Sequence, residues 1–201
     1  MIPSDLARYH LERAIELDPD NAAPRYHLAL YLKEQGLVQE AIIHLRHAVE
    51  VAMRGAEAFA SRAVEYGESH QYDRAKRYLL RSKEERTLSA LASYELGLIL
   101  MSGGQNNEAE EQFTHAVESD PTHADTYYQL GRIELEKGRE REARDLFEEA
   151  VEMDFTHARA HIELACLIPS DEDKKTAENH YLIALDLDES LKRNDLEKRF
   201  G

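Results

Sequence analysis

The sequence predicts an all-α protein made of stacked antiparallel helix pairs, and three observations support this prediction. The chain is rich in Ala, Leu, Glu and Arg, which favour helices, and it has no alternating Val, Ile and Thr runs typical of strands. Its residue pattern recurs with a period of 34. Gly36, Gly104 and Gly138 share one position of that period, where a residue without Cβ ends a helix.

Small residues mark the period most clearly. A pair whose second member is always Gly or Ala recurs every 34 residues, as Leu28-Ala29, Arg62-Ala63, Leu96-Gly97, Leu130-Gly131 and Leu164-Ala165. Alanine follows twelve positions later in each repeat, at Ala41, Ala75, Ala109, Ala143 and Ala177. A large side chain comes four residues after that, at Leu45, Leu79, Phe113, Phe147 and Tyr181.

These columns predict one array over residues 1–201. It comprises a half repeat (1–21), repeat 1 (22–55), repeat 2 (56–89), repeat 3 (90–123), repeat 4 (124–157), repeat 5 (158–191) and a C-terminal capping helix (192–201). Each helix of about 14 residues is only roughly 21 Å long. Because one pair cannot enclose its own apolar face, we expect neighbouring repeats to stack into a right-handed α-α superhelix with a concave inner wall.

The columns resemble the signature of the tetratricopeptide repeat, and the resemblance covers residues 1–191. The usual Pro near the end of the repeat occurs only at Pro19 and Pro121, both after Asp. Arg62 stands where Leu is usual, and Pro169 interrupts a helix, so we expect repeats 2 and 5 to be the least regular. The resemblance implies a non-enzymatic scaffold or adaptor that binds proteins, but fold alone names no partner.

The resemblance also places the first helix of each pair along a binding groove. The groove residues this predicts are Tyr26, Leu30, Val64, Tyr94, Glu95, Leu98, Asp125, Tyr128, Arg132 and Ile162. An aromatic, aliphatic and acidic wall of this kind suits a peptide or partner helix with apolar anchors and basic flanks. The Lys and Asn residues with which some members of the family hold a terminal carboxylate are absent from these columns. The alternative is that the tyrosines only pack against neighbouring helices.

Charge is distributed unevenly along the chain. The formal net charge of −15 argues against nucleic acid as a partner, because phosphate binding depends on Lys and Arg. Residues 22–89 carry 9 acidic and 11 basic side chains, whereas residues 90–191 carry 24 acidic and 8 basic ones. The acidic C-terminal half predicts attraction of a Lys/Arg-rich partner. The alternative is an acidic surface that only interacts with water.

The sequence contains no recognisable catalytic or metal-binding constellation. His157 and His161 are four residues apart, but no third ligand stands at motif spacing, so we expect structural roles for both. His44 and His47 form a weaker pair of the same kind. Cys166 has no activating neighbour in the sequence and is expected to be an inert apolar residue. We therefore expect no enzymatic activity, no cofactor and no metal.

Two further functions fit the same pattern. The half repeat lacks its partner helix and leaves Leu11 less covered, so the protein could self-assemble through residues 1–21. The array could also be the regulatory segment of a larger enzyme. Helical repeats that read RNA are a further class, which the acidic wall disfavours. The longest apolar runs are too short for a membrane span and the N-terminus lacks a signal-peptide pattern, which together indicate a cytoplasmic protein.

Overall fold

The computed structural model describes residues 4–200, excluding the side chains of residues 4, 5 and 170–172. Within this range every regular element is a helix, which confirms the all-α class. The chain divides into two compact units, an N-terminal unit (Met1–Pro121) and a C-terminal unit (Thr122–Gly201).

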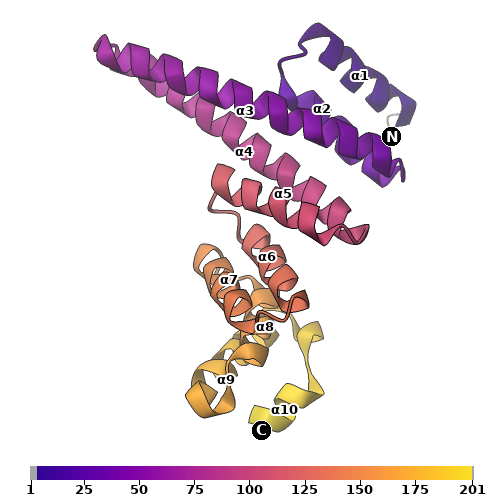
Figure 1. The fold of residues 1–201 in the computed structure, drawn as a ribbon, viewed down its shortest axis with the longest axis vertical. Helices are drawn as coiled ribbons and strands as arrows, with labels where there is room; N and C mark the ends of the chain where they lie inside the picture. Colours follow the sequence, from indigo (N-terminus) through magenta and orange to yellow (C-terminus); the bar gives the residue numbers. More distant parts are fainter. Residues whose placement is uncertain (1–3, 201) are drawn as a thin grey trace. The chain divides into compact units, whose positions relative to one another are not determined.

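Five helices form the N-terminal unit, and two of them are much longer than a repeat helix (Figure 1). The helices are α1 (Ser4–Leu17), α2 (Ala22–Glu34), α3 (Val38–Glu68), α4 (Tyr72–Ser102) and α5 (Asn106–Ser119). Helices α3 and α4 contain 31 residues each and lie antiparallel along one another. Each joins the second helix of one predicted repeat to the first helix of the next without a break.

We call the turn between the second helix of one repeat and the first helix of the next a corner. The residue at the first position of this corner explains why α3 and α4 continue. Where the second helix ends, that position holds Asp120, Asp154 or Asp188, each with extended backbone at ψ between 97° and 99°. The Oδ1 atom of Asp154 accepts a hydrogen bond from the Thr156 amide at 2.9 Å, which turns the chain as Asp residues commonly do. Ala52 and Arg86 occupy the same position in α3 and α4. Both favour helix, and neither has a short acceptor that competes with helical hydrogen bonds.

As a result, repeat 2 does not stack between repeats 1 and 3. Three contacts join residues 62 positions apart and connect repeat 1 directly to repeat 3: Lys33–Glu95 at 2.6 Å, Arg46–Glu108 at 3.2 Å and Met53–His115 at 2.9 Å. Residues 56–87 instead continue as the far part of the α3–α4 hairpin, here named the hairpin arm (Figure 1). Leu79 shows the consequence, since it is 57% exposed whereas Leu45, Phe113 and Phe147 in the same column are fully buried.

The turn at the end of the hairpin arm keeps the repeat geometry in spite of its sequence. His70 has φ 56°, in the column where Gly36, Gly104 and Gly138 have φ between 75° and 77°. The left-handed conformation of this turn is therefore required even where the residue is not Gly. Repeat 2 thus keeps the turn between its own two helices. It lacks only the corners that would separate it from repeats 1 and 3.

The C-terminal unit contains shorter helices that follow the predicted repeats more closely. They are α6 (Ala124–Glu136), α7 (Glu140–Met153), α8 (Ala158–Leu167), α9 (Ser170–Leu187), the 3-10 helix η1 (Glu189–Leu191) and α10 (Asn194–Phe200). Pro169 lies two residues after the end of α8 and limits that helix to 10 residues, which agrees with the irregularity expected for repeat 5. Leu196 of α10 is buried with Ile162, Ala165 and Tyr181 in one cluster.

Close approach of two helices depends on the small residue of each pair. An ideal Cβ atom on Gly131 would lie 2.6 Å from the Phe147 ring, and one on Gly97 would lie 2.6 Å from the Phe113 ring. Both rings are fully buried. The repeats thus place an aromatic ring where the missing side chain would be.

Buried His161 and half-buried His180 form a hydrogen-bonded pair in the C-terminal unit. His161 is 1% exposed, and its Nε2 atom lies 2.9 Å from the Phe155 carbonyl oxygen, to which it donates. Its Nδ1 atom must then accept a hydrogen bond from Nδ1 of His180 at 2.8 Å, which requires a neutral His161 ring. Burial lowers the pKa of both residues, and their mutual repulsion lowers that of His180 further.

Gly131→Ala is expected to destabilise the protein by about 1 to 3 kcal/mol, because the added methyl overlaps a ring that has no room to move. Gly67→Ala is the control, because Gly67 is helical and nothing lies within 4 Å of its Cβ position. That substitution should stabilise by about 0.5 to 1 kcal/mol. Urea unfolding of both variants measures the difference, and equal effects would show that the close approach is unimportant.

Acidification from about pH 7 to pH 5 is expected to lower the free energy of unfolding. In this range the unfolded chain, with His pKa near about 6.5, binds protons more readily than buried His161 and half-buried His180, because burial lowers the pKa of both. Each histidine contributes at most about 1.4 kcal/mol per pH unit. His180→Gln should reduce the slope, whereas His47→Gln, at an exposed position, should not. Equal slopes for both variants in denaturant titrations would refute this assignment.

Candidate functional site

The predicted groove residues of the N-terminal unit lie in two places. Tyr26 and Leu30 of α2 and Tyr94, Glu95 and Leu98 of α4 are all half-buried. Glu95 accepts the 2.6 Å ion pair from Lys33, which ties α2 to α4. Burial raises the pKa of Tyr26 and the Glu95 charge raises it further, so these two residues face one another. The structure therefore brings α2 and the second half of α4 together as one wall.

Val64 lies apart from that wall, on the hairpin arm. Its side chain is 59% exposed, because α3 continues straight past the corner position and carries this residue away from α2. Glu57, Ala60 and Val64 are spaced at i, i+3 and i+7 and share one face of α3.

In the C-terminal unit the predicted residues are more enclosed. Tyr128 is 7% exposed, with its ring centroid 5.6 Å from that of Phe147 and 5.0 Å from that of His157. Ile162 is 5% exposed within an apolar cluster. Asp125 is exposed, and Arg132 donates to Gln129 at 3.2 Å. Asp125 and Arg132 thus present polar groups beside a tyrosine that contributes mainly to packing.

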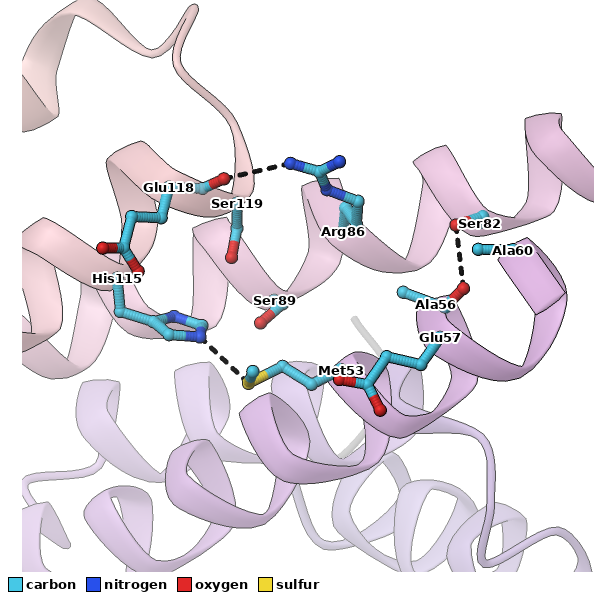
Figure 2. Close-up of a pocket in the computed structure, with 10 residues that line it drawn as sticks. All are labelled: Met53, Ala56, Glu57, Ala60, Ser82, Arg86, Ser89, His115, Glu118 and Ser119. Atoms are coloured by element: carbon cyan, nitrogen blue, oxygen red, sulfur yellow. Dashed lines mark hydrogen bonds between the residues drawn. The ribbon is translucent and has the colours of Figure 1, made fainter.

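A pocket of about 350 Å³ lies where the hairpin arm leaves the stacked helices (Figure 2). We name it the α3–α5 pocket, because α3, α4 and α5 all contribute to it. It has the size of a small ligand site. Its lining residues are Met53, Ala56, Glu57, Ala60, Ser82, Arg86, Ser89, His115, Glu118 and Ser119.

Hydrogen bonds hold three of the polar side chains around the α3–α5 pocket, those of Ser82, Arg86 and His115. Arg86 donates to the Glu118 carbonyl oxygen at 3.0 Å, and Ser82 donates to the Ala56 carbonyl oxygen at 2.8 Å (Figure 2). His115 lies 2.9 Å from the Met53 sulfur and 2.9 Å from the Ser93 hydroxyl. These contacts hold the rim in one arrangement without a ligand.

Ser89 is the lining residue whose hydroxyl is buried without a partner among the described residues. The residue is only 1% exposed, and its Oγ atom has no hydrogen-bond partner among the described residues. A buried hydroxyl without a partner costs about 1 to 3 kcal/mol. Ser89 therefore places an unpaired hydroxyl in the wall of the α3–α5 pocket.

The histidines and the cysteine have structural surroundings. His157 Nδ1 accepts from the Ala160 amide at 3.1 Å and so caps the start of α8. Within residues 4–200, described side chains form no group of three or more His, Cys, Asp and Glu that could hold a metal. Arg193, which the sequence did not connect with Cys166, lies 3.2 Å from its sulfur. Burial nevertheless raises the pKa of Cys166 to about 11, so the thiol stays protonated at neutral pH.

The described part of the chain contains no helix that combines the length and the apolar character needed to cross a membrane.

The pocket residues outside the first helices could not be found from the groove columns. Arg86 and Ser89 belong to the end of repeat 2, where a corner is expected. The available signal was the missing Asp at Ala52 and Arg86, which indicates that the helices continue and that the end of repeat 2 faces α5.

Comparison with known proteins agrees with the repeat architecture. The sequence pattern of the tetratricopeptide repeat matches residues 10–43 and residues 88–154. No curated protein matches the chain. A crystal structure of MamA has a TM-score of 0.61 and 19% identity, covering 93% of this chain and 84% of that one. Another crystal structure of MamA has a TM-score of 0.62 and 18% identity, covering 94% and 96%.

The likeness to these solved structures is one of fold, and it confirms the predicted α-α superhelix class. The two matched segments together cover half of the sequence and lie in both compact units. Together with the helix pairs and their buried small residues, they establish that the chain belongs to the tetratricopeptide-repeat family.

Proposed function

We propose that this protein is a non-enzymatic scaffold that binds an extended peptide or a partner helix, with the α3–α5 pocket as its anchor site. The observation that carries the proposal is the Ser89 hydroxyl, buried without a partner in a preformed pocket. Peptides offer the carbonyl and amide groups that such a hydroxyl needs. Met53, Ala56 and Ala60 supply the apolar surface for a side chain.

The bound segment is expected to extend from the pocket along the hairpin arm or along the predicted groove. The face of Glu57, Ala60 and Val64 continues from the pocket along α3. Tyr26, Leu30, Tyr94 and Leu98 offer half-buried apolar surface on α2 and α4. A peptide with one apolar anchor in the pocket and further apolar side chains fits both paths.

A partner carrying Lys or Arg is favoured by the acidic C-terminal half. Residues 90–191 carry 24 acidic and 8 basic side chains. Among them Asp125 is exposed beside half-buried Arg132. A field of this sign speeds the approach of a basic partner, and the effect weakens with salt.

Self-assembly through α1 is a second candidate function, supported by an exposed apolar face. Leu6, Tyr9 and Leu17 are 41%, 59% and 71% exposed. Their spacing of i, i+3 and i+11 places them on one side of α1. Another copy of the chain would cover this face.

Peptides selected against the protein from a random library are expected to lose at least about tenfold in affinity for the Ala60→Phe variant, a change of about 1.4 kcal/mol. The larger ring fills the α3–α5 pocket, where Ala60 is half-buried. Fluorescence anisotropy measures the affinity. Ser89→Ala should also weaken binding without loss of stability, because its hydroxyl has no bond to lose within the described residues.

Ala58→Phe is the matched control for that experiment, because Ala58 is exposed on the same helix and does not line the pocket. It should bind the selected peptides as wild type does. Equal losses for Ala58→Phe and Ala60→Phe, or unchanged binding by Ala60→Phe, would rule out the pocket as the anchor site.

Self-assembly predicts that the mass measured by light scattering grows with protein concentration. Leu6→Ser/Leu17→Ser should abolish this growth by removing the apolar face of α1. Ile43→Ser is the control, since Ile43 is 57% exposed on α3. A constant monomer mass at all concentrations would exclude this second candidate.

A further inference from the structure

The hairpin arm carries a face of arginine and aromatic side chains that has no role in the groove or the α3–α5 pocket. Phe59, Arg62 and Tyr66 follow one another at i, i+3 and i+7 on α3. Arg74, Tyr78 and Arg81 do so at i, i+4 and i+7 on α4. We name these residues, with Arg77, the arginine–tyrosine face. They surround a hollow of about 430 Å³ lined by Tyr66, Arg74, Arg77, Tyr78 and Arg81.

Stacking orders this face before any ligand binds. The Tyr66 and Tyr78 rings are stacked, with centroids 5.2 Å apart and planes at 12°. The Arg74 guanidinium lies 5.6 Å from the Tyr66 ring centroid, and that of Arg81 lies 5.6 Å from the Phe59 centroid. A guanidinium that uses its flat face on a ring keeps its N–H edge available for a carboxylate.

The positive charge of the face is not neutralised by this chain. The Arg62 guanidinium interacts with the Tyr78 hydroxyl and lowers the pKa of Tyr78, and Arg62 also feels the charge of Glu65. Within the described residues, Arg74, Arg77 and Arg81 have no carboxylate at ion-pair distance and are exposed. Elsewhere in the N-terminal unit arginines do find carboxylates, as Arg46 does with Glu108 and Arg54 with Asp20.

The position of the face in the fold also suits a partner. Between residues 57 and 81 only Ala63 and Ala75 are buried, so no other helix covers this part of the hairpin arm. Glu57, Ala60 and Val64 belong to a different set of helical positions on α3. A ligand on the arginine–tyrosine face therefore leaves the α3–α5 pocket accessible.

We propose that the arginine–tyrosine face of the hairpin arm docks an acidic peptide segment of a partner protein. The carboxylates of Glu or Asp accept paired hydrogen bonds from the guanidinium edges of Arg74, Arg77 and Arg81. Apolar side chains between them rest on the Tyr66 and Tyr78 rings. The exposed guanidinium groups of Arg74, Arg77 and Arg81 give the face a charge that complements an acidic occupant.

The spacing of the arginines sets the pattern of the peptide. Arg74 and Arg81 are seven residues apart along α4, or about 10 Å. In a polyproline II chain, which has three residues per turn and a rise of about 3.1 Å, two carboxyl-bearing residues three positions apart lie on the same side and span about the same distance. The segment therefore has an acidic residue at about every third position.

A synthetic peptide with Glu at every third position and one Trp tests the proposal. The protein has no Trp, so peptide fluorescence reports binding without a label. Wild-type protein is expected to bind it at low salt, and Arg74→Ala/Arg81→Ala should weaken binding by about tenfold or more. Arg74→Lys/Arg81→Lys should weaken it as well, because Lys keeps the charge but lacks the planar paired donors.

Lys76→Ala/Lys83→Ala is the matched control, since it removes the same charge from exposed positions of the same helix. It should change binding by less than about twofold. Similar losses in both Ala pairs would mean general attraction to charge and would overturn the proposal. Binding of a phosphoserine peptide of equal charge but not of the Glu peptide would overturn it too. Ala60→Phe should leave the Glu peptide bound, which separates this site from the α3–α5 pocket.

Discussion

The corner that follows each second helix is the constraint on which the rest of this structure depends. A stacked repeat requires the chain to leave the helix, turn and begin the next helix beside it. Asp120, Asp154 and Asp188 do this with an extended backbone, and Asp154 and Asp188 accept amide hydrogen bonds two residues later. Asp154-Phe155 and Asp188-Glu189 turn without Pro, so Asp is sufficient for this geometry.

Loss of that corner at Ala52 and Arg86 accounts for each unusual feature of the N-terminal unit. The two long helices place repeat 3 against repeat 1, as the Lys33–Glu95 ion pair records. They expose Leu79 and leave the α3–α5 pocket at the base of the hairpin arm. The proposed pocket ligand and the proposed acidic peptide then use separate surfaces, which suits a scaffold that holds two partners of different chemistry.

The sequence predicted the parts of the fold that depend on the repeat columns. Gly97 and Gly131 face Phe113 and Phe147 as the period requires, and the Gly column marks turns between helices. The prediction of separate stacked repeats failed at repeat 2, because the columns describe packing within a helix pair and not where a helix ends. The repeat signature has Pro near the end of the repeat, but the extended backbone lies at the Asp before it.

The candidate site was less predictable for a related physical reason. The groove columns assume that the first helices of the repeats lie side by side. This holds for α2 and the second half of α4, but not for the part of α3 that carries Val64. Ser89 is an ordinary residue in the sequence, and only the three-helix environment shows that its hydroxyl lacks a partner. The arginine–tyrosine face likewise required the pairing of α3 with α4, since its rings and guanidinium groups come from both helices.

The hairpin arm shows that the number of sequence repeats and the number of stacked helix layers can differ. The sequence keeps its 34-residue register through repeat 2, yet in the N-terminal unit that repeat adds no layer between its neighbours. Repeat 2 lacks Asp at both of its corner positions and projects from the stacked helices, although no residue has been inserted or removed. An array of this family can therefore gain a projecting surface without a change in length. The number of sequence repeats is an upper limit on the number of stacked layers.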